Sequence, residues 1–112
     1  MSDFITADGR SIPVDKEGFL VSLEDWSEAV AHALAAQEGI ELTPAHMEFV
    51  LLLRRFYATF QLSPAMRPLV KFVGQELGKE KGSSMYLLSL FPGSPAKLGS
   101  KIAGLPKPEN CL

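Results

Sequence analysis

The residue with the greatest chemical potential is Cys111, the single cysteine of the 112-residue chain and its next-to-last residue. A free cysteine is usually buried and behaves as a small apolar side chain, but Cys111 follows two closely spaced prolines. Its thiolate would be a nucleophile, which Lys101 and Lys107 would favour and Glu109 would oppose. The residues alone leave two interpretations open, a functional thiol or an inert one.

One cysteine excludes an internal disulfide and a multi-cysteine zinc or iron–sulfur site, and two histidines cannot complete a zinc coordination sphere. His46 is able to act as a base, but we interpret it and His32 as packing or surface residues. Aromatic residues at helical spacing are interpreted as core: Trp26, Phe56, Tyr57 and Phe60. The chain has no Walker loop, dinucleotide fingerprint or G-x-S-x-G motif, so we expect no cofactor and no metal.

The composition is that of one globular domain, with 46% apolar and 21% charged residues. The longest apolar run, at residues 49–53, is far shorter than the ~20 residues of a membrane span. The first residues have neither the basic nor the hydrophobic region of a signal peptide. We therefore expect a cytoplasmic protein without membrane contact.

The charges divide unevenly between the two halves of the chain. Residues 1–50 contain ten acids and two bases, whereas residues 51–112 contain nine bases and three acids. One interpretation is a basic face that meets an acidic partner, either nucleic acid or protein. The other is that the two halves fold together and neutralise each other, which we favour.

The chain begins with signals for a β-hairpin, since Asp8 and Gly9 tolerate positive φ and lie between two short apolar runs. A first helix is predicted from Ser22, a suitable N-cap, to a stop at Gly39. A second helix, with Thr43 as its N-cap, has a centre that is apolar on nearly all sides. That pattern predicts a buried central helix.

Three shorter helices are predicted in the second half. The triplet at residues 63–65 is a start signal for one of them, but Pro68 conflicts with a regular first turn. Either the first turn is separate or the regular helix begins at about Arg67. Two others span about residues 85–90 and 94–103, and Gly104 is the predicted stop of the last. The predicted fold class is therefore mainly α, a small helical bundle with an N-terminal β-hairpin.

The tail, residues 105–112, contains two prolines, which forbid a helix and favour extended polyproline II backbone. Fully extended, it spans at most about 26–29 Å. We predict a helical domain with its hairpin over residues 1–104 and a flexible C-terminal arm over residues 105–112 that carries Cys111.

The order of several short motifs resembles the DsrC/TusE family along nearly the whole chain. The most specific motif is the ending G-L-P-K-P-x-x-C-x at residues 104–112. Weaker blocks are D-K-E-G-F-L at residues 15–20, G-I-E-L-T-P-A-H at 39–46 and L-R-R-F-Y at 53–57. On this resemblance the chain is identified as a member of the family.

The family divides by cysteine number, so position 100 indicates the branch. Members that work with sulfite reductase carry a second arm cysteine eleven residues before the penultimate one, where this chain has Ser100. The resemblance therefore favours the single-cysteine sulfur-relay branch, in which no disulfide or trisulfide forms within the arm. It implies a sulfurtransferase that carries a persulfide, with Cys111 as both acceptor and donor of sulfur.

The implied partners are a TusBCD-like donor complex and a tRNA thiouridylase that makes 2-thiouridine at the wobble position, with indirect contact to tRNA. The base of the arm is expected to dock on these partners through Lys101, Gly104, Leu105, Pro106, Lys107 and Pro108. Two other interpretations stay open. One is a non-catalytic regulatory or DNA-binding module, and the other is an accessory subunit of a sulfite reductase.

Overall fold

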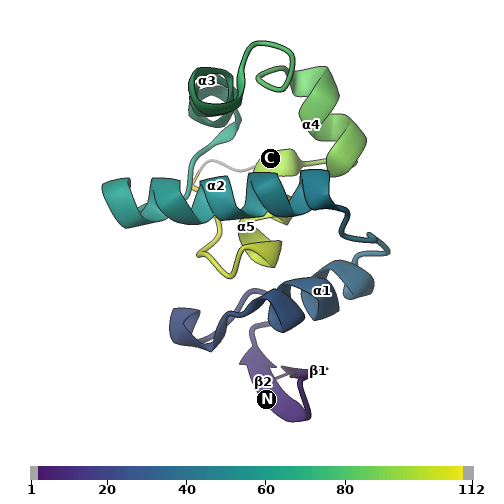
Figure 1. The fold of residues 1–112 in the computed structure, drawn as a ribbon. Coiled ribbons are helices and arrows are strands. Elements are labelled where there is room, and N and C mark those ends of the chain that lie inside the picture. The colour runs from purple at the N-terminus through teal and green to yellow at the C-terminus, as the bar shows by residue number, and fades with distance from the viewer. Residues whose placement is uncertain (1–2, 110–112) are drawn as a thin grey trace.

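Five α-helices follow an N-terminal hairpin in the computed structural model, which describes residues 3–109 (Figure 1). The strands are β1 (Asp3–Ala7) and β2 (Arg10–Val14), and a 3-10 turn, η1 (Leu23–Asp25), precedes the first helix. The helices are α1 (Glu28–Gln37), α2 (Pro44–Phe60), α3 (Met66–Leu77), α4 (Ser84–Leu90) and α5 (Pro95–Ile102). This order confirms the predicted fold class, a mainly α bundle with an N-terminal β-hairpin.

The hairpin turns through Asp8 and Gly9, as predicted. Their φ angles of 51° and 72° are the left-handed backbone that a two-residue type I′ turn requires. In the antiparallel register Ile5 pairs with Ile12, and both side chains are buried. Two strands alone are marginally stable, so the hairpin depends on the packing of β1 against α1 (Figure 1).

The first helix begins later than predicted. Ser22 makes no side-chain cap, and Trp26 has extended backbone, with a φ of −71° and a ψ of 140°. Ser27 caps α1 instead, because its hydroxyl accepts a hydrogen bond from the Val30 N–H. The interruption places the Trp26 indole where its N–H donates to the carbonyl of Ile102 at the end of α5, 2.9 Å away.

The signals around α2 are confirmed. Gly39 has the left-handed φ of 71° that lets the chain leave α1. Thr43 caps α2 and forms a capping box with His46. Helix α2 crosses the middle of the molecule, and it packs against α5 (Figure 1).

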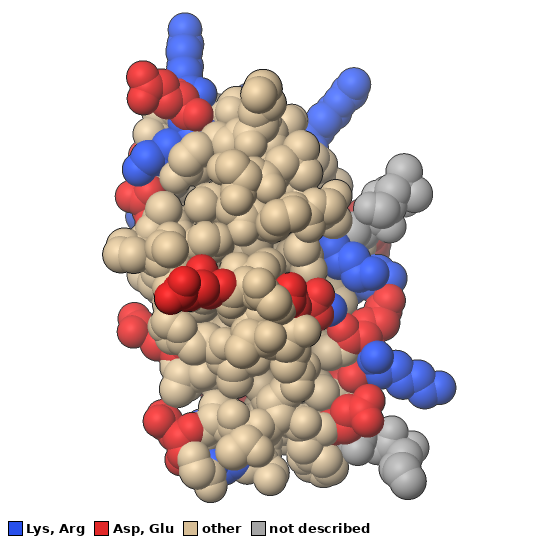
Figure 2. Space-filling view, turned by 90° about the vertical axis from the view of Figure 1, so that its right-hand side faces the viewer, with Lys and Arg blue, Asp and Glu red and all other residues tan. Residues whose placement is uncertain are grey.

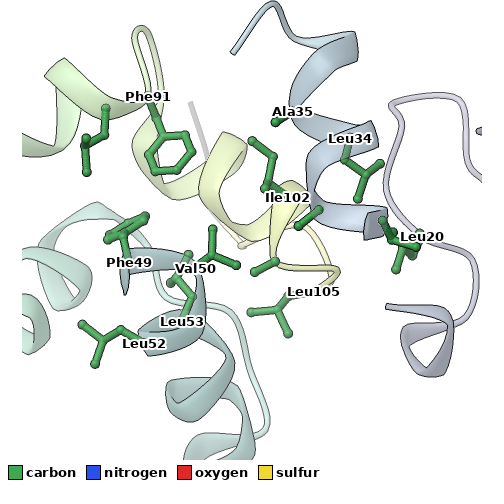
Figure 3. Close-up of a cluster of buried hydrophobic side chains, with 14 of the residues drawn as sticks. Leu20, Leu34, Ala35, Phe49, Val50, Leu52, Leu53, Phe91, Ile102 and Leu105 are labelled. Carbon is green, nitrogen blue, oxygen red and sulfur yellow. The ribbon is translucent and has the colours of Figure 1, made fainter. Parts of the chain in front are cut away.

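The core centres on α5, the helix that leads into the C-terminal segment. Figure 3 shows Ile102 of α5 between side chains of α1, among them Leu34, and side chains of α2, among them Val50. Gly99 permits this close approach, because a Cβ there would lie only 2.7 Å from a ring carbon of Phe49. The C-terminal segment therefore starts from the centre of the core.

α3 begins at Met66 without a side-chain cap. Its N-cap is Ala65, so Ser63 does not cap this helix, and the helix begins one residue before Arg67, the start expected in one of the two alternatives. Pro68 fits in the first turn, because the first N–H groups of a helix have no acceptor within the helix. The Ser63 hydroxyl is used elsewhere, since it donates to the carbonyl of Pro106 at 2.6 Å.

α4 and α5 begin at serine caps, as predicted. Ser83 accepts a hydrogen bond from the N–H of Tyr86, and Ser94 accepts one from the N–H of Lys97. Beyond α5 the chain turns at Gly104, whose φ is 73°. The predicted stop of the last helix is therefore confirmed.

Candidate functional site at the base of the C-terminal segment

The predicted nucleophile, Cys111, lies outside the described residues, so the described part of the site is the chain that leads to it. This chain is the end of α5 and residues 103–109. It contains all the predicted docking residues in one continuous stretch: Lys101, Gly104, Leu105, Pro106, Lys107 and Pro108.

The C-terminal segment leaves α5 through a bend that two side chains hold from outside. The Trp26 indole N–H donates to the Ile102 carbonyl, and an Arg54 Nη1–H donates to the Ala103 carbonyl at 2.6 Å. The guanidinium lies 4.0 Å from the centroid of the indole ring. A Cβ at Gly104 would lie 2.4 Å from Trp26 Cδ1, so only glycine fits this bend. These contacts satisfy the last carbonyls of α5 and fix the direction of exit.

Burial changes the electrostatics of this bend. Desolvation lowers the pKa of Arg54 from its ordinary value. A guanidinium still keeps its proton at neutral pH, so Arg54 remains a charged donor to the carbonyl. A charged donor makes a stronger hydrogen bond than a neutral one, and this strengthens the hold on α5.

The first residues of the predicted arm lie against the helical domain. Leu105 is buried, and its N–H donates to the Ser100 carbonyl at 2.9 Å. The carbonyl of Pro106 accepts the Ser63 hydroxyl, and Pro108 is also buried. The flexibility of residues 105–112 as one arm stays a prediction, but residues 105–108 have defined contacts in this structure.

Glu17, in the segment between β2 and η1, pairs with two lysines. Its carboxylate lies 3.0 Å from the Lys107 ammonium and 3.7 Å from the Lys97 ammonium. The hydrogen bond from Lys107 is the main reason why the pKa of Glu17 lies below its ordinary value. Glu17 therefore connects α5 and the C-terminal segment to the N-terminal part of the chain.

Lys101 differs from the other predicted docking residues, because its side chain is only 9% exposed. Its ammonium donates to the carboxylate of Glu38 at 3.2 Å and lies 5.3 Å from the ring centroid of Phe19. The alkyl stem covers Gly18, where a Cβ would be 3.6 Å from the lysine. A docking role for Lys101 stays a prediction, and the side chain offers a partner little free surface.

The ion pairs connect the acidic half of the chain to the basic half. Five pairs lie within residues 3–109, and four of them join an acid from residues 1–50 to a base from residues 51–112. The exception joins Arg55 to Glu76. This pattern supports the favoured interpretation of the charge asymmetry, in which the two halves neutralise each other.

A pocket of about 400 Å³ lies beside the C-terminal segment. It is formed by the connection between α2 and α3, the start of α3 and the tail, and its lining residues are Gln61, Leu62, Ser63, Ala65, Pro68, Pro106, Lys107 and Glu109. Leu62 is more than half exposed. The chain that carries Cys111 therefore leaves the domain along the wall of an open, largely apolar pocket.

A second apolar surface lies on α4, away from this pocket in the fold. Met85 is 84% exposed and Leu88 is also exposed. Figure 2 views the molecule from the side of α4 and shows the charged side chains mostly along the edges of this face. The charged residues of the ion pairs around Glu17, Lys97 and Lys107, do not lie on α4.

His46 has a structural role, as the sequence analysis favoured. Its Nε2 lies 2.8 Å from the Leu90 carbonyl, which can only accept, so Nε2 carries the proton and donates. Nδ1 then accepts from the Thr43 hydroxyl at 2.8 Å. The ring also makes an edge contact with Phe91. His32 is exposed on α1 and lines a shallow hollow with the loop at residues 39–42.

The interpretation of the aromatic residues as core is confirmed for Phe56, which is buried, and wrong for Phe60. Phe60 is 52% exposed and lies at the C-terminal end of α2. Its ring centroid is 4.6 Å from that of Phe56. Helical spacing placed the residue on the correct side of the helix, but α2 extends past the edge of the core.

Sequence reasoning missed the contacts that Glu17, Arg54 and Ser63 make with the end of the chain. Glu17 and Arg54 lie within the blocks at residues 15–20 and 53–57 that carry the family resemblance. Their position in these two blocks was the one feature of the sequence that could have indicated a role for Glu17 and Arg54. Ser63 carried no such signal, because Ser-Pro-Ala reads as helix-cap chemistry.

Within residues 3–109, no group of three or more His, Cys, Asp or Glu side chains is arranged to hold a metal ion. The helices of the same region include none that is both long and apolar enough to cross a bilayer.

The DsrC-like protein family matches residues 6–112 of this chain. The sulfurtransferase TusE of Yersinia pseudotuberculosis is 54% identical over 105 residues, which are 94% of this chain and 97% of the relative. The sulfurtransferase TusE of Salmonella typhimurium is 52% identical, and the alignment covers 94% of this chain and 96% of that protein.

Solved structures are similar over nearly the whole chain. The NMR structure of Allochromatium vinosum DsrC matches with a TM-score of 0.91 and 49% identity, and all of both chains is covered. The crystal structure of the oxidized gamma-subunit of dissimilatory sulfite reductase from Archaeoglobus fulgidus has a TM-score of 0.84 and 36% identity. That match covers 98% of this chain and all of the other.

Ser100 supplies a test of packing beneath the site. It is fully buried, and its hydroxyl has no hydrogen-bond partner among the described atoms. A buried hydroxyl without a partner costs about 1–3 kcal/mol, so Ser100→Ala is expected to raise the free energy of unfolding by roughly 1 kcal/mol. Ser63→Ala is the matched control: it removes a bonded hydroxyl and is expected to lower that free energy by about 1 kcal/mol. Equal losses for both variants in urea unfolding would contradict this account.

The pairing of Glu17 is testable by titration. Its depressed pKa means that the Lys107 pair stabilises the fold above the ordinary carboxyl pKa, and that this contribution is lost as the pH falls through the folded pKa. Lys107→Met is expected to raise the pKa of Glu17 toward its ordinary value. Lys97→Met should raise it less, because that ammonium is farther away. The measurement is the carboxyl carbon shift by NMR; equal shifts in both variants would refute the assignment.

Proposed function

This chain belongs to the DsrC-like protein family, and on that premise we propose that it is a sulfur carrier that takes up and releases sulfur on Cys111. The name sulfurtransferase in its curated relatives supports a sulfur-relay function. One observation carries the assignment to this residue: Cys111 is the single cysteine of the chain, so no other side chain can hold a persulfide.

The reaction is thiol exchange in two equivalent steps. The Cys111 thiolate attacks the outer sulfur of a donor persulfide, the S–S bond of the donor breaks, and the donor thiolate leaves with the electron pair. Cys111 then carries –S–SH, and an acceptor thiolate attacks its outer sulfur in the same way. Each step breaks one S–S bond and forms one, so no oxidant or reductant is consumed.

The base of the C-terminal segment supports such a carrier. The chain leaves the domain through a fixed bend at Gly104, and the two prolines that follow restrict its backbone. A restricted backbone loses less entropy when it is ordered in a partner's pocket, so insertion costs less free energy. We propose the exposed residues Pro106 and Lys107 as the part of the segment that a partner meets first.

The proposed relay serves tRNA thiolation in the cytoplasm. A TusBCD-like complex would donate the sulfur, and a tRNA thiouridylase would accept it for 2-thiouridine at the wobble position. The support is the name TusE shared by relatives that are 52–54% identical over nearly their whole length. A sulfane sulfur held covalently on a carrier does not diffuse away between the two enzymes.

Position 100 argues against the role of a sulfite-reductase subunit, which one of the similar solved structures has by its name. Ser100 is buried in α5, and its hydroxyl cannot form a disulfide or trisulfide with Cys111. The chain therefore lacks a second thiol for redox chemistry between two cysteines.

The direct test is the mass of the intact protein after incubation with a persulfide donor. The wild type is expected to gain one sulfur atom that a reducing thiol removes, and Cys111→Ser is expected to gain none. A hydroxyl is too weak an acid to form the nucleophile and cannot hold a sulfane sulfur. The helical circular dichroism of the variant should match that of the wild type.

The matched control is His46→Ala, which removes a packing side chain and should leave sulfur loading intact. A Cys111→Ser variant that supports full 2-thiouridine formation, in cells without the native protein, would show that sulfur does not travel on this residue.

A further inference from the structure

Two side chains from distant parts of the chain hold neighbouring residues of the C-terminal segment. Ser63 lies between α2 and α3, 43 residues before Pro106, whose carbonyl accepts its hydroxyl. Glu17 lies between β2 and η1, 90 residues before Lys107. The Lys107 ammonium donates a hydrogen bond to the Glu17 carboxylate at 3.0 Å. The segment is thus held from two separate elements at two consecutive residues.

We propose that Ser63 and Glu17 are positioning residues that fasten the C-terminal segment at residues 106–107 and so limit the space in which the Cys111 thiol moves. This inference rests on the proposed function of Cys111. Neither residue touches the reacting sulfur in this account; both act through the backbone and side chain of the segment that they hold.

The Ser63 hydroxyl binds the C-terminal segment and does not cap the neighbouring helix α3. Ser63 is only 7% exposed, and it lies two residues before the N-cap of α3, which has no side-chain cap of its own. A serine at that N-cap would stabilise the helix by about 1 kcal/mol. The connection between the helices instead directs its hydroxyl to Pro106, which indicates that the tail contact is its role.

The Glu17 contact comes from a loop whose shape is already set. The N–H of Glu17 donates to the Asp15 carboxylate at 2.9 Å, and the N–H of Gly18 donates to the Asp15 carbonyl at 3.0 Å. The loop holds the Glu17 carboxylate between Lys97 of α5 and Lys107 of the tail. The carboxylate therefore meets the tail at one place relative to α5.

The two contacts change the reach of the thiol. Cys111 is four residues beyond Lys107, which allows at most about 13–14 Å between their Cα atoms, whereas six residues from the buried Leu105 allow about 20–22 Å. The accessible volume scales with the cube of this reach, so loss of both contacts dilutes the thiol roughly threefold at a docked partner. Fastening at residues 106–107 thus limits how far the thiol can lie from the wall of the pocket that Pro106 and Lys107 line.

The single cysteine allows a direct test in the full-length chain. A nitroxide attached to Cys111 broadens the NMR signals of nearby amides. In the wild type we expect the strongest broadening at residues 61–65, in the loop around Glu17 and in the tail. In Ser63→Ala/Glu17→Gln we expect it to weaken there and to spread to amides elsewhere on the domain. Glu76→Gln, which breaks an exposed ion pair without a tail residue, is the matched control and should keep the wild-type pattern.

A transfer assay separates positioning from a purely structural role. Loading of Cys111 from glutathione persulfide needs no docking, so its rate should be equal in the wild type and the double variant. Loading from a persulfidated TusBCD-type complex should be slower in the double variant, by up to about threefold. Unchanged core amide shifts would verify that the double variant is folded. Glu17→Gln alone changes an exposed residue and should slow loading from the complex in the same direction, by a smaller factor.

The outcomes are distinct for this inference and for the function on which it rests. An unchanged broadening pattern in the double variant overturns the positioning role, and so does a spread pattern with unchanged transfer from the protein donor. Failure of the wild type to load sulfur at all overturns the proposed function instead. The broadening pattern would still decide in that case whether Ser63 and Glu17 fasten the segment.

Discussion

The rest of the structure depends on the two hydrogen bonds that Trp26 and Arg54 donate to the last carbonyls of α5. Ile102 and Ala103 are fully buried, and a buried carbonyl without a partner costs about 1–3 kcal/mol. The two donors also stack on each other, so each stabilises the position of the other. Because the indole occupies the space that a Cβ at Gly104 would need, three residues from separate segments determine where the chain leaves the core.

The proposed function requires a small domain to present one reactive thiol, and this exit bears on that requirement. A sulfur carrier needs a narrow segment that enters other proteins, and it also needs that segment to start from a defined point. The described residues supply the second requirement through the bend, the burial of Leu105 and the contacts of Ser63 and Glu17. The acidic N-terminal half takes part, because its carboxylates pair with lysines of the C-terminal half.

Local chemistry was sufficient to predict the hairpin and most helix ends, and the resemblance of several motifs indicated the family. The turn at Asp8 and Gly9 and the cap at Thr43 depend on residues within a few positions, so the sequence shows them directly. The later start of α1 and the role of Ser63 could not be predicted in this way. Trp26 lies outside the helix, and its indole N–H donates to a carbonyl 76 residues away. Ser63 does not cap a helix, and its hydroxyl donates to a carbonyl 43 residues away.

Lys101 illustrates the same limit for the site. A lysine near the C-terminus is expected on the surface, and only the fold brings Glu38 and Phe19 to it, so its burial has no local signal. The proposed nucleophile, in contrast, could be named from the sequence because the chain has one cysteine. Contacts between distant residues therefore decide how the segment is held, while its chemistry is a property of the residue itself.

The central claim is that sulfur travels covalently on this chain, and a single-turnover chase tests it most directly. The protein is loaded with radiolabelled sulfane sulfur, freed of donor, and mixed with a tRNA thiouridylase and its activated tRNA substrate, with no other source of sulfur. The account predicts that the label lost from Cys111 appears in 2-thiouridine, one atom for each nucleoside formed. Label that stays on the protein, or that is released to the solution without entering 2-thiouridine, would contradict it.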